Sequence, residues 1–197
     1  MTDLDSHYDR SLEIALIGDL TEHEADLTEK LLAVPFGGSC TLYINSPGGG
    51  AYSAMSLLSV ISLRQLRLTA VVTGECSSAA LWPFAACARR LVTATSVFLF
   101  HPMKWQSEEH VALSEAAEWA RHFGKLETSM DAMLAKYLQI PEKQLRRWME
   151  PGRYLSGAEL AAAGVAELVD LQPPGPWNAV PARSNKTPRR RAKVATS

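Results

Sequence analysis

The sequence has no apolar run of 18 residues or more, and its first ten residues, MTDLDSHYDR, are polar and acidic. A membrane-spanning helix needs about 20 mainly apolar residues, and a secretory leader needs a basic stretch followed by an apolar one. The three cysteines, Cys40, Cys76 and Cys87, do not have the spacing of a metal site or a disulfide framework. The sequence therefore argues against a membrane protein. It predicts buried free thiols, a cytoplasmic location, and no metal ion or cofactor.

Acidic residues are absent after Asp170. The segment 172–197 carries six basic residues and five prolines, whereas the chain before it has 14 basic residues against 21 acidic ones. Such a composition buries little apolar surface and predicts a disordered, solvated tail, with a nucleic-acid contact as the weaker alternative. We expect three parts: a short polar N-terminal segment (1–11), one folded domain (12–171) and this tail.

Between these ends, strand-like and helix-like segments alternate. The segments rich in β-forming residues are Leu12–Gly18, Cys40–Ser46, Leu68–Gly74 and Val92–His101. The segments with apolar residues at helical spacing are 19–34, Tyr52–Leu66 and the long Leu113–Leu138. Either Asp19 or Thr21 could cap the first helix. The stretch SGAELAAAGVAELVD predicts a capped helix, a glycine stop and a short strand, and the whole order predicts an α/β layered fold.

Three glycines directly follow a strand in LYINSPGGG. Glycine permits a positive φ and lets backbone N–H groups approach a ligand closely. The turn has neither the Lys-Ser/Thr ending of a P-loop nor GxGxxG spacing, so nucleotide binding is discounted. An oxyanion hole, in which N–H groups stabilise a negatively charged oxygen, and a plain turn remain as alternatives. A second question comes from the two adjacent serines of TGECSSAA, either of which could be a nucleophile or a helix cap.

Taken together, LYINSPGG, the later TGECSSAA and the strand SVFLFHP resemble the Clp protease proteolytic subunit (ClpP) family. The closing stretch YLSGAELAAAGVAELVD is similar to the end of that family's domain. The resemblance covers roughly Leu12 to Leu171. It implies a ClpP/crotonase-type fold of repeated β-β-α units with a long handle-type helix. It also implies a serine endopeptidase that cleaves peptides or unfolded polypeptides within a homo-oligomer, a heptameric ring or double ring, without a cofactor.

The resemblance assigns roles to individual positions. Ser78 matches the nucleophile and His101 the general base, and Ser77 is left with a capping or packing role. A serine hydroxyl is a weak nucleophile until a neighbouring base takes its proton, and histidine is suited to that task. The positions that match the oxyanion hole and substrate-binding turn are Gly48, Gly49 and Ala79.

The third member of the triad departs from the family pattern. Aligned on RYLSG, the position of the family's acid is Gly152. Glu150 is the surrogate acid if the EPG turn swings it inward, and a solvent-exposed carboxylate is the alternative. Asp131 and Glu109 are more remote candidates. Loss of the acid lowers the rate roughly 10⁴-fold in related serine mechanisms, although a backbone carbonyl or a water on the histidine can leave weak activity.

Two further departures concern partners. The polar segment before the first strand is shorter than the family's axial loops, which weakens the expectation of an ATPase unfoldase partner. The family's glycine-rich strand after the histidine is replaced by MKWQSEEHVAL. The long apolar stripe of Leu113–Leu138 still predicts oligomerisation.

Two other functions stay open. One is a weak or inactive ring subunit with a structural or regulatory role, which Gly152 motivates. The other is an acyl-CoA enzyme of the crotonase fold. The Ser78–His101 pair argues against the second, because such enzymes do not need it.

Overall fold

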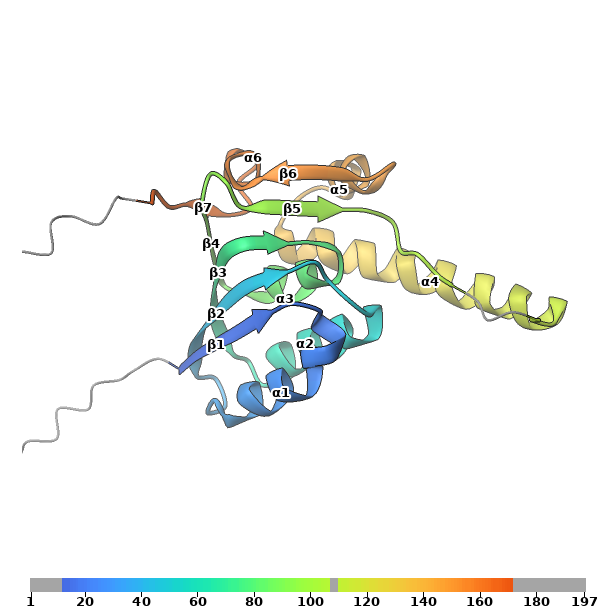
Figure 1. Ribbon diagram of the computed structural model, residues 1–197, viewed down its shortest axis with the longest axis horizontal. Coiled ribbons are helices and arrows are strands. Elements are labelled where there is room, and N and C mark those ends of the chain that lie inside the picture. Colours follow the sequence, from blue (N-terminus) through green and yellow to red (C-terminus); the bar gives the residue numbers. More distant parts are fainter. Residues whose placement is uncertain (1–11, 107–109, 172–197) are drawn as a thin grey trace, which may run out of the picture.

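The computed structural model describes residues 12–106 and 110–171 (Figure 1). The expected segments 1–11 and 172–197 lie outside the described residues, so the disordered tail remains a prediction. The strands are β1 (Leu12–Ile17), β2 (Ser39–Ser46), β3 (Arg67–Cys76), β4 (Arg89–Val92), β5 (Val97–Phe100), β6 (Arg153–Ser156) and β7 (Glu167–Leu168). The helices are α1 (Leu20–Ala33), α2 (Ala51–Leu63), the 3₁₀ turn η1 (Ser78–Ala80), α3 (Leu81–Ala86), α4 (Leu113–Leu138), α5 (Glu142–Met149) and α6 (Gly157–Ala162).

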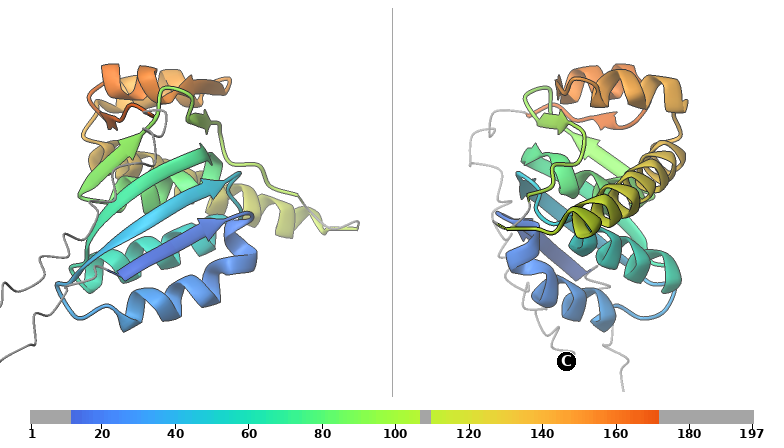
Figure 2. Two further views of the ribbon diagram at one scale, coloured as in Figure 1. Left: turned by 60° about the vertical axis from the view of Figure 1, so that its left-hand side comes forward. Right: turned by 90° about the vertical axis from the view of Figure 1, so that its right-hand side faces the viewer.

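The sheet is mostly parallel. Its main path runs β1-β2-β3-β4-β7, and β5 pairs in parallel with β3 and antiparallel with β6. Strands β2 and β3 alternate buried and less buried residues, as expected for strands with one face on the core. The helices α1 and α2 lie side by side against one face of this sheet (Figures 1 and 2). The predicted α/β architecture is confirmed.

The first helix begins as its sequence predicts. The Asp19 carboxylate accepts hydrogen bonds from the N–H groups of Thr21 (2.8 Å) and Glu22 (3.4 Å), so Asp19 rather than Thr21 is the cap. At the other end of the domain, Ser156 and Glu159 form a reciprocal capping box at the start of α6. The predicted cap, glycine stop and short strand in this region are confirmed.

The long helix α4 has the predicted bounds, but only part of it packs on the domain. Its buried residues are Met130, Leu134, Ala135 and Leu138, all in the C-terminal half. The N-terminal half projects away from the sheet (Figures 1 and 2), and Leu113 is 87% exposed. No helix of the described residues is long and apolar enough to cross a membrane.

The prediction of one strand over Val92–His101 is wrong. Strand β4 ends at Val92 and β5 begins at Val97. The hydroxyl of Ser96 accepts from the N–H of Thr93 (3.0 Å) and donates to the carbonyl of Val72 (3.1 Å). These bonds close a turn that carries the chain from the β4 ladder to the β5–β6 pair.

The three cysteines are free and buried, as predicted. Burial raises the pKa of the Cys76 and Cys87 thiols, so both are poor nucleophiles. Among residues 12–106 and 110–171, no group of three or more His, Cys, Asp or Glu residues is placed to hold a metal ion.

Candidate active site

Three segments that directly follow β2, β3 and β5 meet at one edge of the sheet. They are the glycine turn, the serine pair and the histidine segment, and carboxyl ends of parallel strands commonly build sites in this way. The N–H of Ser77 donates to the carbonyl of Ser46 (3.0 Å), which ties the second segment to the first. The N–H of Leu99 donates to the Ser77 hydroxyl (3.0 Å), which ties the third segment to the second.

These contacts separate the two serines. Ser77 is 1% exposed, and its hydroxyl is occupied by the backbone of β5. Ser78 is partly exposed and has a φ of 53°, in the left-handed region that non-glycine residues rarely adopt. Such strain persists only where the surroundings impose it, and it is frequent at functional sites. The geometry therefore presents Ser78, and not Ser77, for chemistry.

Gly48 provides the space that this serine needs. A Cβ placed on Gly48 would lie 2.7 Å from the Ser78 Cβ and 2.8 Å from the Ser77 carbonyl oxygen. Gly48 also has a φ of +109°, which side chains disfavour. Only glycine fits here without a shift of the serine segment.

His101 lies beside Ser78, with its Nε2 atom 2.9 Å from the Ser78 Oγ. Its Nδ1 atom is 2.6 Å from the carbonyl oxygen of Pro102. A carbonyl can only accept, so Nδ1 must carry a proton in this contact. In the neutral ring, Nε2 then has the free lone pair and accepts the Ser78 hydroxyl. This is the tautomer that a general base requires.

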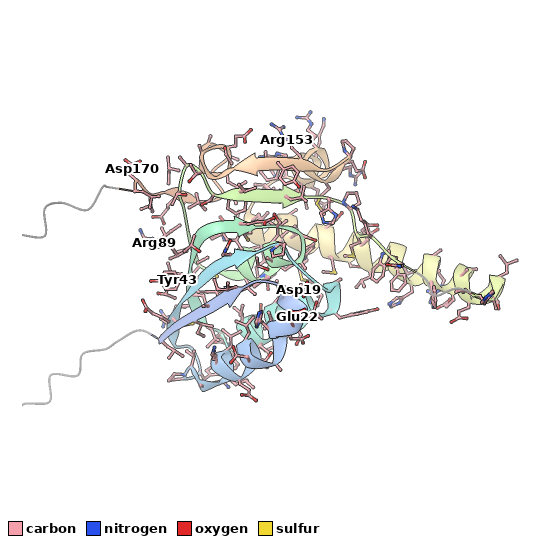
Figure 3. All side chains as sticks on the ribbon, in the orientation of Figure 1. Asp19, Glu22, Tyr43, Arg89, Arg153 and Asp170 are labelled. Atoms are coloured by element: carbon pink, nitrogen blue, oxygen red, sulfur yellow. The ribbon has the colours of Figure 1, made fainter. Side chains whose placement is uncertain are left out.

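The glycine turn is held by the start of α1. The N–H of Leu20 donates to the Gly48 carbonyl (2.7 Å), and the N–H of Gly50 donates to the Thr21 hydroxyl (2.6 Å). Figure 3 shows Asp19 at this start of α1, where the helix follows β1. The backbone next to Gly49 is therefore fixed on both sides.

Two backbone N–H groups belong to the residues next to the serine. Within the part of the chain that the structure describes, the N–H groups of Gly49 and Ala79 donate to no protein acceptor. Both residues line the same cavity as Ser78 and His101. Two free N–H groups beside a serine can stabilise a negatively charged oxygen that forms there.

That cavity has a volume of about 350 Å³. Large apolar side chains line it beyond the serine: Leu81, Trp82, Met103, Trp105 and Met149. Trp105 is stacked on Phe123 of α4, with ring centroids 3.4 Å apart and planes at 11°. The segment after His101 thus packs against α4 through Trp105, whereas the family has a glycine-rich strand at this place in the sequence.

Gly152 lies where the resemblance expects the acid. The β5–β6 register pairs Phe100 with Arg153, and a Cβ on Gly152 would lie 3.5 Å from the His101 Cβ. Glycine offers no carboxylate, and its φ of +119° is one that an aspartate rarely adopts. The residue at this position is therefore next to the histidine but has no acidic side chain.

Among the described residues, no hydrogen bond joins Glu150 to His101, so the surrogate acid remains a prediction that no contact supports. Glu150 is exposed at the end of α5, and the Nδ1 atom that it would contact is already bonded to Pro102. Of the remote candidates, Glu109 lies outside the described residues, and Asp131 lies on α4 in a second cavity.

This second cavity, of about 280 Å³, lies between Pro102, α4 and α5. Burial, reinforced by Glu127 and Glu150 and opposed by Arg146, raises the pKa of Asp131 to about 6. The Glu127 Oε1 atom accepts a hydrogen bond from the N–H of Met103 (2.8 Å). Pro102, whose carbonyl accepts from His101, and Glu127 therefore both line this cavity.

Sequence reasoning names neither the Pro102 carbonyl nor Glu127. A main-chain carbonyl has no sequence signature. Glu127 stands in a helix that the sequence predicts, but its contact with Met103 depends on how α4 packs against the segment after β5. The only available signal is its place one turn before Asp131 on that helix.

Comparison with known proteins gives a consistent answer. The sequence matches the Clp protease family model over residues 3–171. The ATP-dependent Clp protease proteolytic subunit 1 of Mycolicibacterium paratuberculosis (strain ATCC BAA-968 / K-10) is 25% identical over 131 residues, which are 66% of this chain and 62% of that protein. The match thus spans less than two thirds of this relative. A ClpP1 mutant from Listeria monocytogenes has a similar fold, with a TM-score of 0.70 at 17% identity over 81% of this chain and 92% of that one. The chain belongs to the Clp protease family, and its fold is of the ClpP type.

Proposed function

We propose that this protein is a serine endopeptidase that cleaves peptides or unfolded polypeptides through an acyl-enzyme. Ser78 is the nucleophile and His101 the general base. The observation that carries the proposal is the 2.9 Å hydrogen bond between Ser78 and His101, with Nδ1 held at 2.6 Å by the Pro102 carbonyl. The family supports a protease-like function, and the chemistry assigned to each residue is our proposal.

In the first step, the Ser78 Oγ attacks the substrate carbonyl carbon while Nε2 of His101 takes the hydroxyl proton. The N–H groups of Gly49 and Ala79 donate to the oxyanion that forms. One such donor is worth about 2.7–4 kcal/mol in related serine enzymes. His101 then returns the proton to the leaving amine, and a water molecule releases the acyl group by the same route.

The Pro102 carbonyl replaces the missing acid in one of its two roles, which is to fix the tautomer of His101. In a triad, the acid fixes the imidazole tautomer and stabilises its cation, and losing the tautomer lowers kcat about 10⁴-fold. A carbonyl oxygen enforces the same tautomer, because it cannot donate a proton to Nδ1. It stabilises the cation only through a dipole. We therefore expect a serine peptidase that is slower than a complete triad but well above background.

The substrate preference follows from the cavity. Most of the large side chains that line it are leucine, methionine and tryptophan, with Tyr52 and Lys104 beside them. Burial of an apolar side chain there is worth about 1.5–3 kcal/mol relative to exposure. We expect cleavage next to large apolar residues of the substrate.

The second candidate is a weak or inactive subunit with a structural or regulatory role. Gly152 favours it, since no side chain at that position supports His101. A crotonase-type acyl-CoA enzyme is less well supported, because its chemistry gives no reason for the Ser78–His101 bond.

Oligomerisation is part of the proposal. The N-terminal half of α4 has no buried residue and projects from the domain (Figure 1), which fits a surface that packs on other subunits. We expect a heptameric ring or a double ring, and an ATPase unfoldase partner is a weaker expectation. Native mass spectrometry should give a seven-fold or fourteen-fold species, and a plain monomer would count against a chambered protease.

The chemistry is tested with a fluorophosphonate probe, which reacts with activated serines. Intact-mass and peptide analysis should locate the adduct on Ser78, and Ser78→Ala should abolish it. Ser77→Ala is the control at the neighbouring residue, and in this variant the adduct should still be found on Ser78. A correctly assembled protein that takes up no probe would leave the structural role as the better account.

A further inference from the structure

We propose that Glu127 is a positioning residue that supports His101 through the peptide group between Pro102 and Met103. The inference rests on the proposed peptidase function and names a residue that would replace the missing acid. It does so indirectly, since Glu127 makes no contact with the histidine ring among the described residues.

The geometry is a chain of three hydrogen bonds through one peptide group. The carbonyl of that group, on Pro102, accepts from His101 Nδ1 at 2.6 Å. The N–H of the same group, on Met103, donates to Glu127 Oε1 at 2.8 Å. Beyond the ring, Nε2 meets the Ser78 hydroxyl at 2.9 Å. A carboxylate, a peptide group, an imidazole and a serine are therefore joined in this order by hydrogen bonds.

A peptide group transmits charge because its N–H and C=O are conjugated. A carboxylate that accepts from the N–H draws the proton toward itself and leaves more negative charge on the carbonyl oxygen. Chains of hydrogen bonds polarise one another in this way, by roughly 10–30% per bond. The oxygen that faces Nδ1 then binds an imidazolium more strongly than an isolated carbonyl does. The carboxylate thus acts on the histidine in the sense of a triad acid.

The helix that carries Glu127 is held in place on its C-terminal side. Met130 and Leu134, within two turns of Glu127, are 1% and 0% exposed. Glu127 itself is half-buried at the wall of the second cavity, where an ionic hydrogen bond is screened less than on the open surface. The carboxylate therefore has a fixed place from which to hold the Met103 N–H.

Other charged groups face the same cavity. They are Asp131 on α4, Glu142 and Arg146 on α5, and Glu150 after it. None of them has a hydrogen bond to the Pro102–Met103 peptide group in the described residues, so the direct link belongs to Glu127 alone. Their fields act on the whole region, and the test must separate such a field from the link.

Three variants make this separation. Glu127→Gln removes the charge but keeps an oxygen that can accept the Met103 N–H. Glu127→Ala removes both. Glu142→Gln makes the same chemical change as the first variant on the wall of the same cavity, without a bond to the peptide group. The measurements are the rate constant of fluorophosphonate labelling at Ser78 from pH 5 to 9, hydrogen exchange at the Met103 amide, and the NMR resonance of the His101 Nδ1 proton.

We expect Glu127→Gln to slow labelling about 3- to 10-fold, and Glu127→Ala about 10- to 100-fold. The acidic limb of the pH–rate profile should move to lower pH in both, because the imidazolium loses its support. The Nδ1 proton resonance should move upfield in Glu127→Gln, and Met103 exchange should rise only in Glu127→Ala. Glu142→Gln should stay within about two-fold of the wild type, since it changes only a remote charge.

The inference is overturned if Glu127→Gln keeps the wild-type rate, pH profile and Nδ1 resonance, or if Glu142→Gln moves them equally. If Glu127→Ala does not fold, the inference is still tested, because the labelling rate and the Nδ1 resonance of Glu127→Gln are sufficient by themselves. The proposed function fails separately, when the wild type takes up no probe at Ser78. The Nδ1 resonance and Met103 exchange still test the peptide link in that case.

Discussion

The two sides of His101 are built in different ways. On the Nε2 side, the serine, the glycine turn and the two free N–H donors come from short segments that follow neighbouring strands. On the Nδ1 side, the acceptor is a main-chain carbonyl, and its support comes from a helix far along the chain. The sequence motifs of the first side are those on which the family resemblance rests, and Gly152 on the second side departs from the family pattern.

The two sides of the histidine tolerate substitution to different degrees. The serine side needs a backbone that lies in one place, since Ser78 has a left-handed φ and Gly48 lies against it. The other side needs only a hydrogen-bond acceptor in the direction of Nδ1. Many groups can supply one, so an acid can be lost at Gly152 while the histidine keeps its tautomer.

Among changes to the backbone around the histidine, the largest effect is expected from Gly48→Ala. The added Cβ would overlap the Ser78 Cβ at 2.7 Å and the Ala79 N at 2.9 Å, so the serine segment must move. Labelling of Ser78 should fall about 100-fold or more, as expected when a reacting group is displaced by about 1 Å. Thermal unfolding should report a loss of about 2 kcal/mol in stability from the strained backbone.

Gly124→Ala is the matched control for that change. Gly124 lies in α4 with nothing within 4 Å of an added Cβ, so alanine should stabilise the helix by about 0.5–1 kcal/mol. Its labelling rate should be that of the wild type. If Gly48→Ala behaves like this control, the serine side is not as rigid as described.

A smaller effect is expected from Gly152→Asp, which installs the family's acid. The φ of +119° disfavours aspartate, and Nδ1 already has an acceptor. We expect no gain in the labelling rate and a loss of about 1–2 kcal/mol in stability, measured by thermal unfolding. Gly152→Ala should lose the same stability without a carboxylate. A ten-fold faster Gly152→Asp would mean that the carbonyl is a poor substitute for the acid.

The smallest effect is expected from Asp131→Asn, which changes how the free energy of unfolding depends on pH. Burial raises the pKa of Asp131 from 3.8 to about 6, so the folded protein favours the neutral carboxyl. The wild type should lose this contribution as the pH rises from about 4 to above 6, because ionisation is then easier in the unfolded chain.

The asparagine variant cannot ionise, so its advantage should grow over the same range and then stay constant. Because the residue is only half-buried, we expect the difference to reach about 1 kcal/mol at pH 7 and to vanish at pH 4. Urea unfolding at the two pH values measures it. An equal difference at both would show that Asp131 has no raised pKa.

Much of the fold follows from the sequence, and the reasons are local. Apolar residues recur at helical spacing along the whole of α4, α1 has its capping aspartate, and α6 has its capping box. Each of these helices is therefore predicted where it occurs. The break between β4 and β5 is not predicted, since it depends on a bond from Ser96 to the distant Val72. Patterns within a segment reveal its type, but not the long-range bonds that interrupt it.

The site divides in the same manner. Spacing and resemblance select Ser78, His101 and the glycine turn, and the structure brings these together. The sequence predicts Glu150 as the surrogate acid, and it offers a backbone carbonyl as another partner for the histidine without saying which one. The Pro102 carbonyl that meets Nδ1 could not be found in this way, since every residue has a carbonyl and only the fold decides where it points.

Activation of Ser78 by His101 is tested most directly by the rate of probe labelling at Ser78 in the wild type and in His101→Gln, at pH 7 and with equal assembly. The proposed mechanism has His101 activate Ser78 without a side-chain acid. It predicts that labelling is confined to Ser78 and that His101→Gln lowers its rate constant about 10³-fold or more. Equal rates in the two proteins would contradict it, because the histidine would then not raise the reactivity of the serine.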